Sequence, residues 1–181
     1  MKLTGTRLIA APADIVWAGL NDPEVLKACI PGCQTLEKTS DTSFEAVVKQ
    51  KVGPVSATFK GAVELSDMNP PHSYRIAGEG KGGAAGFAKG GADVSLKEQT
   101  GGDTGLQTEL TYDVDAKVGG KIAQLGARLI DGFAKKMADQ FFTKFQDVIE
   151  GAGKLDEAAA GTADAPTPEA AKKGWLKRLV S

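Results

Sequence analysis

The sequence has few of the residues on which most catalytic and metal sites depend. It contains two cysteines, Cys29 and Cys33, and a single histidine, His72. A structural zinc site takes about four ligands, so no metal site is predicted. Two thiols close to an expected turn are taken as reduced cysteines rather than a redox pair. A nucleophilic cysteine needs a neighbouring base, and His72 follows Pro70-Pro71 in an expected exposed turn, so no catalytic residues are predicted.

An excess of charge and long apolar runs are absent too. The formal net charge is −1, from 22 basic and 23 acidic residues. Nucleic-acid binding by an overall positive field is therefore not expected. No segment approaches the roughly 20 apolar residues needed to cross a bilayer, and residues 1–7 do not have the pattern of a secretory signal. We expect a cytoplasmic protein, and 41% hydrophobic residues are enough to build a core.

Two short helices are predicted behind a first strand. Residues 2–10 alternate as a strand does. Pro12 can open a helix because the first turn has no use for its missing N–H. Asp22 and Pro23 supply a cap and a first turn for the second helix, which ends near Pro31-Gly32.

Period-2 alternation then continues through the middle of the chain and predicts half-buried antiparallel strands. Gly53-Pro54 is the turn of one predicted hairpin, and Gly101-Gly102-Asp103 is a turn of another. The strands are placed at residues 43–52, 55–65, 74–80, 87–97 and 106–118.

The period changes to three and four residues from about 119 to 150, which predicts one amphipathic helix of roughly 45 Å. Its stripe consists of Ile122, Leu125, Leu129, Phe133, Met137, Phe141, Phe145 and Val148. Such a helix is stabilised by packing its stripe on another surface, and the strands provide the only large one. The order strand, two short helices, about six strands (five of them located by the alternation) and long helix predicts an α+β domain over residues 1–150. In it, a curved antiparallel sheet of about seven strands wraps around the long helix.

The composition changes after residue 150. Residues 151–173 are rich in alanine and include Pro166 and Pro168, so they are predicted to form a disordered linker. Residues 174–181 are predicted to form a short amphipathic segment that contacts an anionic membrane. A partner-binding peptide and an unstructured end are the alternatives. The residues of this contact are Lys172, Lys173, Trp175, Leu176, Lys177, Arg178 and Leu179.

Three segments, in this order, carry a resemblance to a known family. They are Asn21-Asp22-Pro23 leading to Cys29-Ile30-Pro31-Gly32-Cys33, Lys51-Val52-Gly53-Pro54-Val55 leading to Phe59-Lys60-Gly61, and the glycine-rich residues 78–90. Over about residues 1–150 the chain resembles the CoxG family of carbon monoxide dehydrogenase subunits, a branch of the START-like (SRPBCC) helix-grip superfamily. The resemblance implies the helix-grip fold and a non-catalytic role. It also implies a molybdenum hydroxylase as partner, recruited to the inner face of the cytoplasmic membrane.

The glycine-rich run contains Gly78, Gly80 and Gly83 at the spacing of a dinucleotide-binding motif. That motif works between a strand and a helix, whereas strands are predicted on both sides here. The glycines are therefore interpreted as permitting a bend or a close approach. Lys81 and Lys89 around Phe87 are an alternative mouth or docking loop.

A helix-grip sheet separates from its helix in the middle and leaves an apolar cavity, which is the usual character of a small-molecule site. The residues expected to line it are Trp17, Leu26, Ile30, Phe59, Phe87, Tyr112, Leu129, Phe133 and Met137. Each of them alone could instead be ordinary core. The expected ligand is an isoprenoid quinone or a lipid, with no covalent cofactor. The alternatives are a scaffold or maturation factor with a filled core, and a helix-grip enzyme such as a cyclase or hydrolase.

Overall fold

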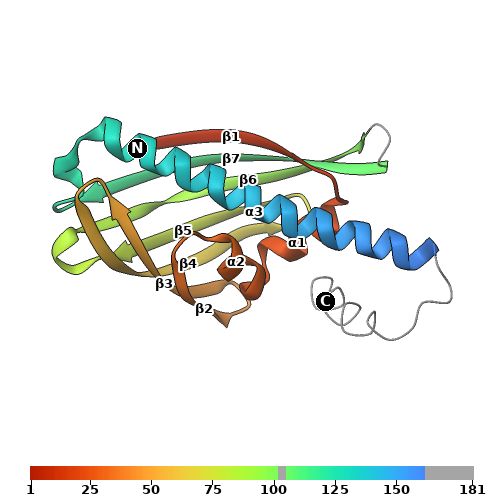
Figure 1. Ribbon diagram of the computed structural model, residues 1–181, viewed down its shortest axis with the longest axis horizontal. Helices are drawn as coiled ribbons and strands as arrows, with labels where there is room; N and C mark the ends of the chain where they lie inside the picture. Colours follow the sequence, from red (N-terminus) through yellow and green to blue (C-terminus); the bar gives the residue numbers. More distant parts are fainter. Residues whose placement is uncertain (102–104, 162–181) are drawn as a thin grey trace.

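The computed structural model describes residues 1–101 and 105–161, with side chains as far as Gly151 (Figure 1). In that part of the chain an antiparallel sheet is combined with two short helices and one long one. The elements are β1 (Lys2–Ile9), α1 (Ala13–Leu20), α2 (Pro23–Cys29), β2 (Cys33–Ser40), β3 (Ser43–Val52), β4 (Val55–Asn69), β5 (Ser73–Lys81), η1 (Gly83–Ala85), β6 (Phe87–Gly101), β7 (Gly105–Gly119), η3 (Ala123–Leu125) and α3 (Ala127–Gly161).

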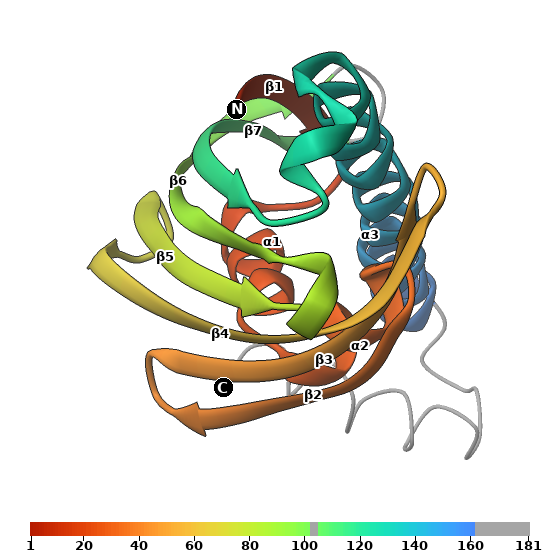
Figure 2. The same ribbon diagram turned by 90° about the vertical axis from the view of Figure 1, so that its left-hand side faces the viewer.

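The sheet has seven strands in the order β1-β7-β6-β5-β4-β3-β2. All neighbours from β2 to β7 are consecutive hairpins, and β1 closes the order by pairing with β7. Figure 2, which looks along α3, shows the sheet curling around one side of this helix. The predicted α+β class and the curved sheet around a long helix are confirmed.

Helix capping follows the predicted chemistry. Pro12 is the N-cap of α1, and Pro23 occupies the first turn of α2. The Asp22 carboxylate accepts hydrogen bonds from the backbone N–H groups of Glu24, at 2.8 Å, and Val25, at 3.5 Å. Such a cap satisfies amide groups that have no partner within the helix.

The long helix begins later than predicted. Residues 119–126 are not α-helical: β7 continues to Gly119, and η3 precedes α3, which starts at Ala127. Gly120 and Gly126 have φ of +79° and +92°, a conformation that glycine adopts without strain and that an α-helix does not contain. The spacing of Ile122 and Leu125 fits a 3₁₀ turn as well as an α-helix, and this ambiguity misled the prediction.

The helix also ends later than predicted. The composition predicts a disordered linker from residue 151, but α3 continues to Gly161. Four alanines with Lys154, Leu155 and Glu157 favour helix over this stretch despite its three glycines, and the first proline is Pro166. The rest of the linker and the segment 174–181 lie outside the described residues. A strand that the alternation pattern did not identify, β2, pairs with β3.

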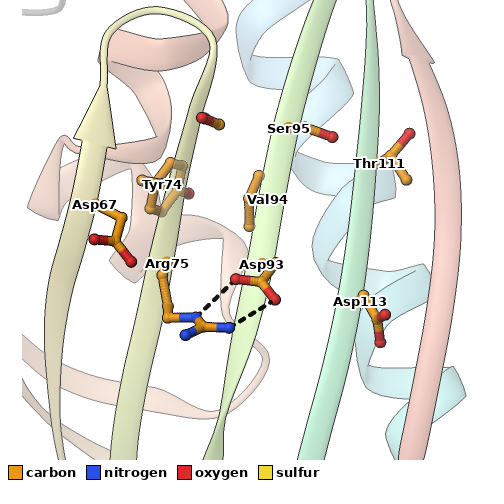
Figure 3. A pocket seen from close by; sticks show the side chains of 9 residues that line it. Asp67, Tyr74, Arg75, Asp93, Val94, Ser95, Thr111 and Asp113 are labelled. Carbon is orange, nitrogen blue, oxygen red and sulfur yellow. Dashed lines mark hydrogen bonds and ion pairs between the residues drawn. The ribbon is translucent and has the colours of Figure 1, made fainter.

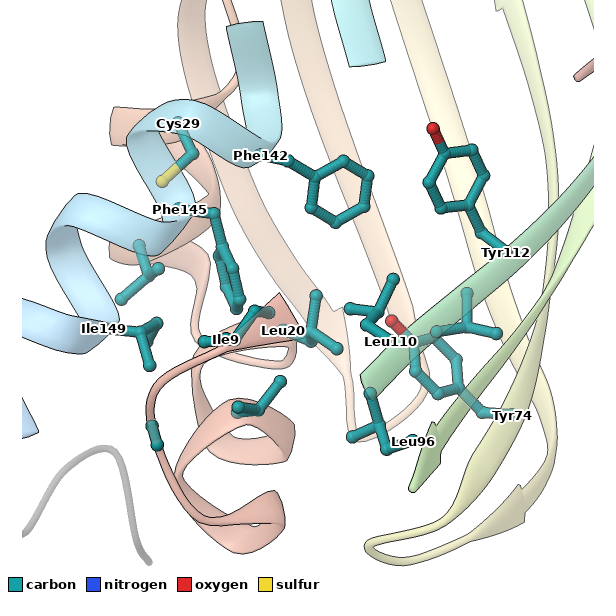
Figure 4. Close-up of a cluster of buried hydrophobic side chains, with 14 of the residues drawn as sticks. Ile9, Leu20, Cys29, Tyr74, Leu96, Leu110, Tyr112, Phe142, Phe145 and Ile149 are labelled. Carbon is teal, nitrogen blue, oxygen red and sulfur yellow. The ribbon is translucent and has the colours of Figure 1, made fainter. Parts of the chain in front are cut away.

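The core forms two clusters, one toward each end of α3. The larger contains α1, α2, the strand ends beside them and the second half of the described α3 (Figure 4). Phe145 and Ile149 of α3 are fully buried there together with Ile9, Val16 and Leu110. The smaller cluster joins Val52, Ala85 and Ile122 from three connections at the other end.

Polar contacts on one side of α3 fix it to β1. Arg7 forms an ion pair with Asp139. The Gln146 side chain donates to the backbone oxygen of Leu8 at 2.8 Å, and Glu150 accepts from the backbone N–H of Ala10 at 3.1 Å. These α3 positions recur at helical spacing, so the second half of the helix is held at its apolar face and at its side.

Replacing Phe145 with alanine is expected to lower the free energy of unfolding by about 3–5 kcal/mol, because a fully buried ring is replaced by a cavity. Urea denaturation followed by circular dichroism measures this. Leu8→Ala removes an exposed side chain and is expected to change the free energy of unfolding by no more than about 0.5 kcal/mol. Equal effects of the two substitutions would contradict the assignment of the core.

Candidate ligand cavity

A cavity of about 710 Å³ lies between the concave face of the sheet and α3. Residues of both core clusters contribute to its wall: Leu20, Phe44 and Leu110 belong to the larger one, Val52 and Ile122 to the smaller one. The hollow therefore lies between two packed ends. Its volume is within the range of about 300–1,000 Å³ that is usual for small-molecule sites.

The floor of the cavity is hollow because small residues occupy inward positions of neighbouring strands. The strand register aligns these positions into two rows across the sheet. One row is Ala46, Gly61, Gly80, Ala88 and Val118, and the other is Val63, Gly78, Gly90 and Ala116. Glycine and alanine leave uncovered the volume that leucine or phenylalanine would fill at the same positions.

The roof is the first half of α3. Ile130, Phe133, Ala134 and Met137 face the cavity, and Phe141 and Phe142 follow toward the larger cluster. These positions are three or four residues apart, as the faces of a helix require. The second half of α3 is packed and tied to β1, so the first half spans the space above the small-residue floor.

Few polar side chains belong to this wall. Gln50 lies on the inner face of β3, and its amide donates to the backbone oxygen of Pro31, so its polar end is occupied by the protein. Glu79 and Lys89 alternate with the inward Gly78, Gly80 and Gly90, so their side chains point toward the outer face. What remains are two tyrosines, Tyr74 and Tyr112.

Six of the nine residues predicted for the cavity lie along its wall. They are Leu26, Ile30, Phe59, Tyr112, Phe133 and Met137. They come from the α2 end, from strands β4 and β7 and from α3, so the fold brings together residues far apart in the sequence. Whether they contact a ligand remains a prediction.

The other three predicted residues do not line the cavity. The ring of Trp17 packs edge-on against Tyr74, with centroids 5.2 Å apart, and so supports a wall residue from outside. Phe87 is 44% exposed and occupies an outward position of β6, whose inward residues are Ala88 and Gly90. Leu129 is 41% exposed and covers the Gly53 turn. Aromatic or aliphatic character alone misled these three predictions.

The residues that sequence reasoning missed are mostly small or aliphatic and alternate along predicted strands. Examples are Ala46 and Val48 of β3, Ile76 of β5 and Ala92 of β6. The alternation already predicted which face of each strand is inward. The missing step was the register between strands, which decides that the small residues form one continuous floor.

The glycine-rich run is part of this floor. Gly78 and Gly80 belong to β5 and Gly83 to η1, and β6 follows, so strands flank the run as predicted. The interpretation of the motif as a bend and not a dinucleotide site agrees with this topology. The substitution of any side chain at Gly90 would be obstructed, because a Cβ there would lie 2.2 Å from the backbone oxygen of Asp115.

A small depression of about 250 Å³ on the outer face of the sheet is polar (Figure 3). Its main feature is the ion pair of Arg75 and Asp93, with Nε and Oδ1 2.8 Å apart. The hydrogen bond from Arg75 lowers the pKa of the Asp93 carboxyl. Both side chains are mostly exposed, and an exposed ion pair adds little stability.

The cysteines are both free thiols. Cys29 is buried in the larger cluster, and burial raises its pKa to about 11, partly offset by Lys144. Cys33 is partly exposed, and burial raises its thiol pKa too. A raised pKa disfavours the reactive thiolate. His72 is exposed in its turn, and within the described residues no group of three or more His, Cys, Asp or Glu is placed to hold a metal.

The fold and the cavity together define the class of protein. A curled seven-stranded antiparallel sheet around a long helix, with two short helices after the first strand, is the START-like helix-grip fold. Residues 5–150 match the model of the CoxG family of carbon monoxide dehydrogenase subunits, and the chain belongs to this family. No curated protein matches the sequence. No helix in the described part of the chain is long and apolar enough to span a bilayer.

Several solved structures are similar. A conserved protein from Geobacillus kaustophilus shares 31% identity, covering 84% of this chain and 97% of that one, with a TM-score of 0.75. A START superfamily protein from Mycobacterium smegmatis is 14% identical over 83% of this chain and 97% of that one, with a TM-score of 0.60. The Zhui aromatase/cyclase from Streptomyces sp. R1128 is 16% identical over 83% and 93%, with a TM-score of 0.55. The last two show the fold alone.

Gly80 offers a direct test of the hollow floor. A Cβ added there meets no heavy atom within 4 Å, so Gly80→Leu is expected to extend into the cavity and to keep or raise the free energy of unfolding. Gly90→Leu, in the neighbouring row, is expected to lower the free energy of unfolding by at least about 1–3 kcal/mol, because its side chain would collide with the backbone oxygen of Asp115. Urea denaturation compares the two. If Gly80→Leu lowered the free energy of unfolding as much as Gly90→Leu does, the floor of the cavity would not be open at Gly80.

Proposed function

We propose that this protein is a non-catalytic accessory protein that carries an apolar molecule in the cavity between sheet and α3. The family and the fold indicate a ligand-binding accessory role. The observation that supports the proposal most is the combination of a large volume with an almost entirely apolar wall. Water gains few hydrogen bonds in such a space, whereas an apolar molecule gains roughly 25 cal/mol for each Å² that it removes from water.

An isoprenoid quinone or a lipid is the class of ligand that we propose. The cavity extends from the Val52–Ile122 end to the Leu20–Phe44 end, so it accepts an elongated molecule rather than a compact one. A quinone would also suit an oxidising partner, which has to pass electrons to an acceptor otherwise confined to the membrane. No covalent cofactor is required for this role.

The proposed partner is a molybdenum hydroxylase of the carbon monoxide dehydrogenase type. The support for it is the family, whose name describes a subunit of carbon monoxide dehydrogenase. We propose that the protein recruits this enzyme to the cytoplasmic face of the membrane. The C-terminal segment with Trp175, Lys177 and Arg178 is the proposed peripheral contact, and its residues suit an anionic interface.

An enzymatic function of the cyclase type is the second candidate, because one similar structure is an aromatase/cyclase. Acid–base catalysis in an apolar pocket requires a titratable group with a suitable pKa. Of the two tyrosines on the cavity wall, burial raises the pKa of Tyr74 further from neutrality. A cyclase-type enzyme would need a group in the cavity that titrates near pH 7, whereas a carrier needs no titrating group.

Native mass spectrometry of the protein purified from its own host tests the carrier role. The wild-type chain is expected to retain a co-purifying apolar molecule, and Gly80→Leu is expected to retain several times less of it. The control is Thr58→Leu, an exposed position on the outer face of β4, which should retain as much as wild type. A wild-type protein that is free of any lipid-soluble molecule, and that takes up none from membrane extracts, would contradict the proposal.

A further inference from the structure

The two tyrosines of the cavity wall have hydroxyl groups without a protein partner. Tyr74 is 5% exposed and Tyr112 is 7% exposed, yet among the described residues no hydrogen bond involves either hydroxyl. In the described residues, the side-chain polar atoms that are fully buried and lack a partner are Arg7 Nε and Asp22 Oδ2. Each tyrosine oxygen therefore keeps some accessible surface although its residue is buried. Buried tyrosine hydroxyls normally find a partner.

The strand register places these tyrosines together on the inner face. Tyr74 of β5 is opposite Val94 of β6, and Val94 is opposite Tyr112 of β7. The two therefore occupy one row across the sheet with a single strand between them, so their Cα atoms are about 10 Å apart. Gly5 of β1 continues the row: a Cβ there would lie 2.3 Å from the Tyr112 hydroxyl, so the absence of a side chain makes room for that group.

Neighbouring aromatic rings hold both tyrosines in place. Phe142 of α3 stacks on Tyr112 with centroids 5.1 Å apart and planes inclined by 13°. Trp17 of α1 packs edge-on against Tyr74. Figure 4 shows the two rings on the inner face of the sheet, as members of the larger buried cluster. Fixed rings lose little side-chain entropy when their hydroxyls form a hydrogen bond with a ligand.

We infer that Tyr74 and Tyr112 bind the polar end of the ligand. The class of ligand is an apolar molecule with hydrogen-bond-accepting oxygens, such as ring carbonyls, at one end. That end lies in the Tyr74–Tyr112 row, and the apolar remainder extends toward Phe59 and Ile130 at the other end of the cavity. This inference rests on the proposed function, and it adds an orientation and a chemical preference that an apolar wall alone does not provide.

Removing the hydroxyl oxygens separates recognition from packing. Tyr74→Phe and Tyr112→Phe preserve the rings, and the probes are 2,3-dimethyl-1,4-naphthoquinone and 2,3-dimethylnaphthalene, which differ in the carbonyl oxygens. The methyl groups block addition of the partly exposed Cys33 thiol to the quinone. Affinity is measured by displacement of a fluorescent apolar dye. Each variant is expected to bind the quinone about 3–10-fold more weakly and the hydrocarbon unchanged.

The outcomes distinguish the inference from the function on which it rests. If the wild-type protein binds neither probe, the proposed function is overturned. If it binds both, and the tyrosine variants keep the wild-type ratio of the two affinities, only the role of the hydroxyls is overturned. Equal weakening of both probes would likewise overturn it, since it would reveal a packing role. Val94→Ala, between the tyrosines, is the control that removes contact area but no oxygen.

A separate observation concerns the end of the domain at the smaller cluster. Three connections meet there, within residues 50–56, 80–88 and 118–129, and the backbone N–H of Ile122 donates to Ala85 at 3.0 Å. The end-on view of Figure 2 shows these connections at the near end of the curled sheet. Together the three segments contain four basic residues, Lys51, Lys81, Lys121 and Arg128, and no acidic residue. We name this surface the basic end.

The basic end also carries exposed apolar side chains. Phe87 and Leu129 are two of the four large apolar residues that are most exposed in the described part of the chain, and both belong to these segments. All four basic side chains are exposed, and the nearest acidic residues lie just outside the segments: Glu79, 3.8 Å from Lys81, and Asp131, three residues after Arg128 in α3. In a chain with a net charge of −1, a local charge of +4 is a pronounced asymmetry.

We propose that the basic end docks on an anionic lipid surface. Lysine and arginine near a charged leaflet each add attraction, and an exposed phenylalanine and leucine enter the boundary between headgroups and acyl chains. This docking would place the packed smaller-cluster end of the cavity against the membrane, so the apolar space would lie close to the bilayer behind the Val52–Ala85–Ile122 cluster. The contact is independent of the C-terminal segment, which lies outside the described residues.

Flotation of the full chain with phosphatidylcholine vesicles, with and without phosphatidylglycerol, tests this contact. Phe87→Ser/Leu129→Ser and Lys81→Glu/Lys121→Glu are each expected to weaken binding to the anionic vesicles at least about tenfold. Leu8→Ser removes an exposed leucine from β1 and should bind as wild type does. Trp175→Ser is measured beside them. Unchanged binding by both double variants, or wild-type binding that does not depend on phosphatidylglycerol, would overturn the proposal.

Discussion

The packing of the second half of α3 against α1, α2 and β1 is the constraint on which the rest of the domain depends. Phe145 and Ile149 are fully buried, and Ile149 approaches the backbone of α1 at Gly19, where a Cβ would lie only 2.4 Å from it. The ion pair of Arg7 with Asp139 holds the same part of the helix from the side. Because this half is fixed, the first half has to extend above the concave sheet at a distance that the packed end determines.

A helix held in this way would still cover a solid core if large residues stood beneath it. The hollow results from the glycines and alanines of two cross-strand rows. The cost is a weaker sheet, since glycine stabilises strands poorly. Long, fully paired hairpins compensate: β6 and β7 pair along their whole length, and β1 adds to β7. A run that resembles a nucleotide motif in the sequence is thus the floor of an apolar space.

The proposed carrier role rests on how polarity is distributed. Apart from Gln50, whose amide is bonded to Pro31, the polar side-chain groups that face the cavity are two tyrosine hydroxyls in one row, while the charged residues of the same strands alternate to the outer face. One end of the domain concentrates basic and exposed apolar residues beside the connections that close the cavity. An apolar interior, a polar recognition row and a basic exterior together suit a protein that exchanges a molecule with a membrane and delivers it to a partner enzyme.

Local pattern in the sequence was sufficient for the class of fold, the two capped short helices and most strands, because alternation and capping depend on near neighbours. The Asn21-Asp22-Pro23 and Gly53-Pro54 segments indicated the family from the sequence alone, and the match of the family model to residues 5–150 agrees with them. The start of α3 at Ala127, the exclusion of Trp17 and Phe87 from the cavity, and the meeting of Gly61 with Gly80 depended on register and helix placement. Those relations join residues far apart in the chain, so only the tertiary structure decided them.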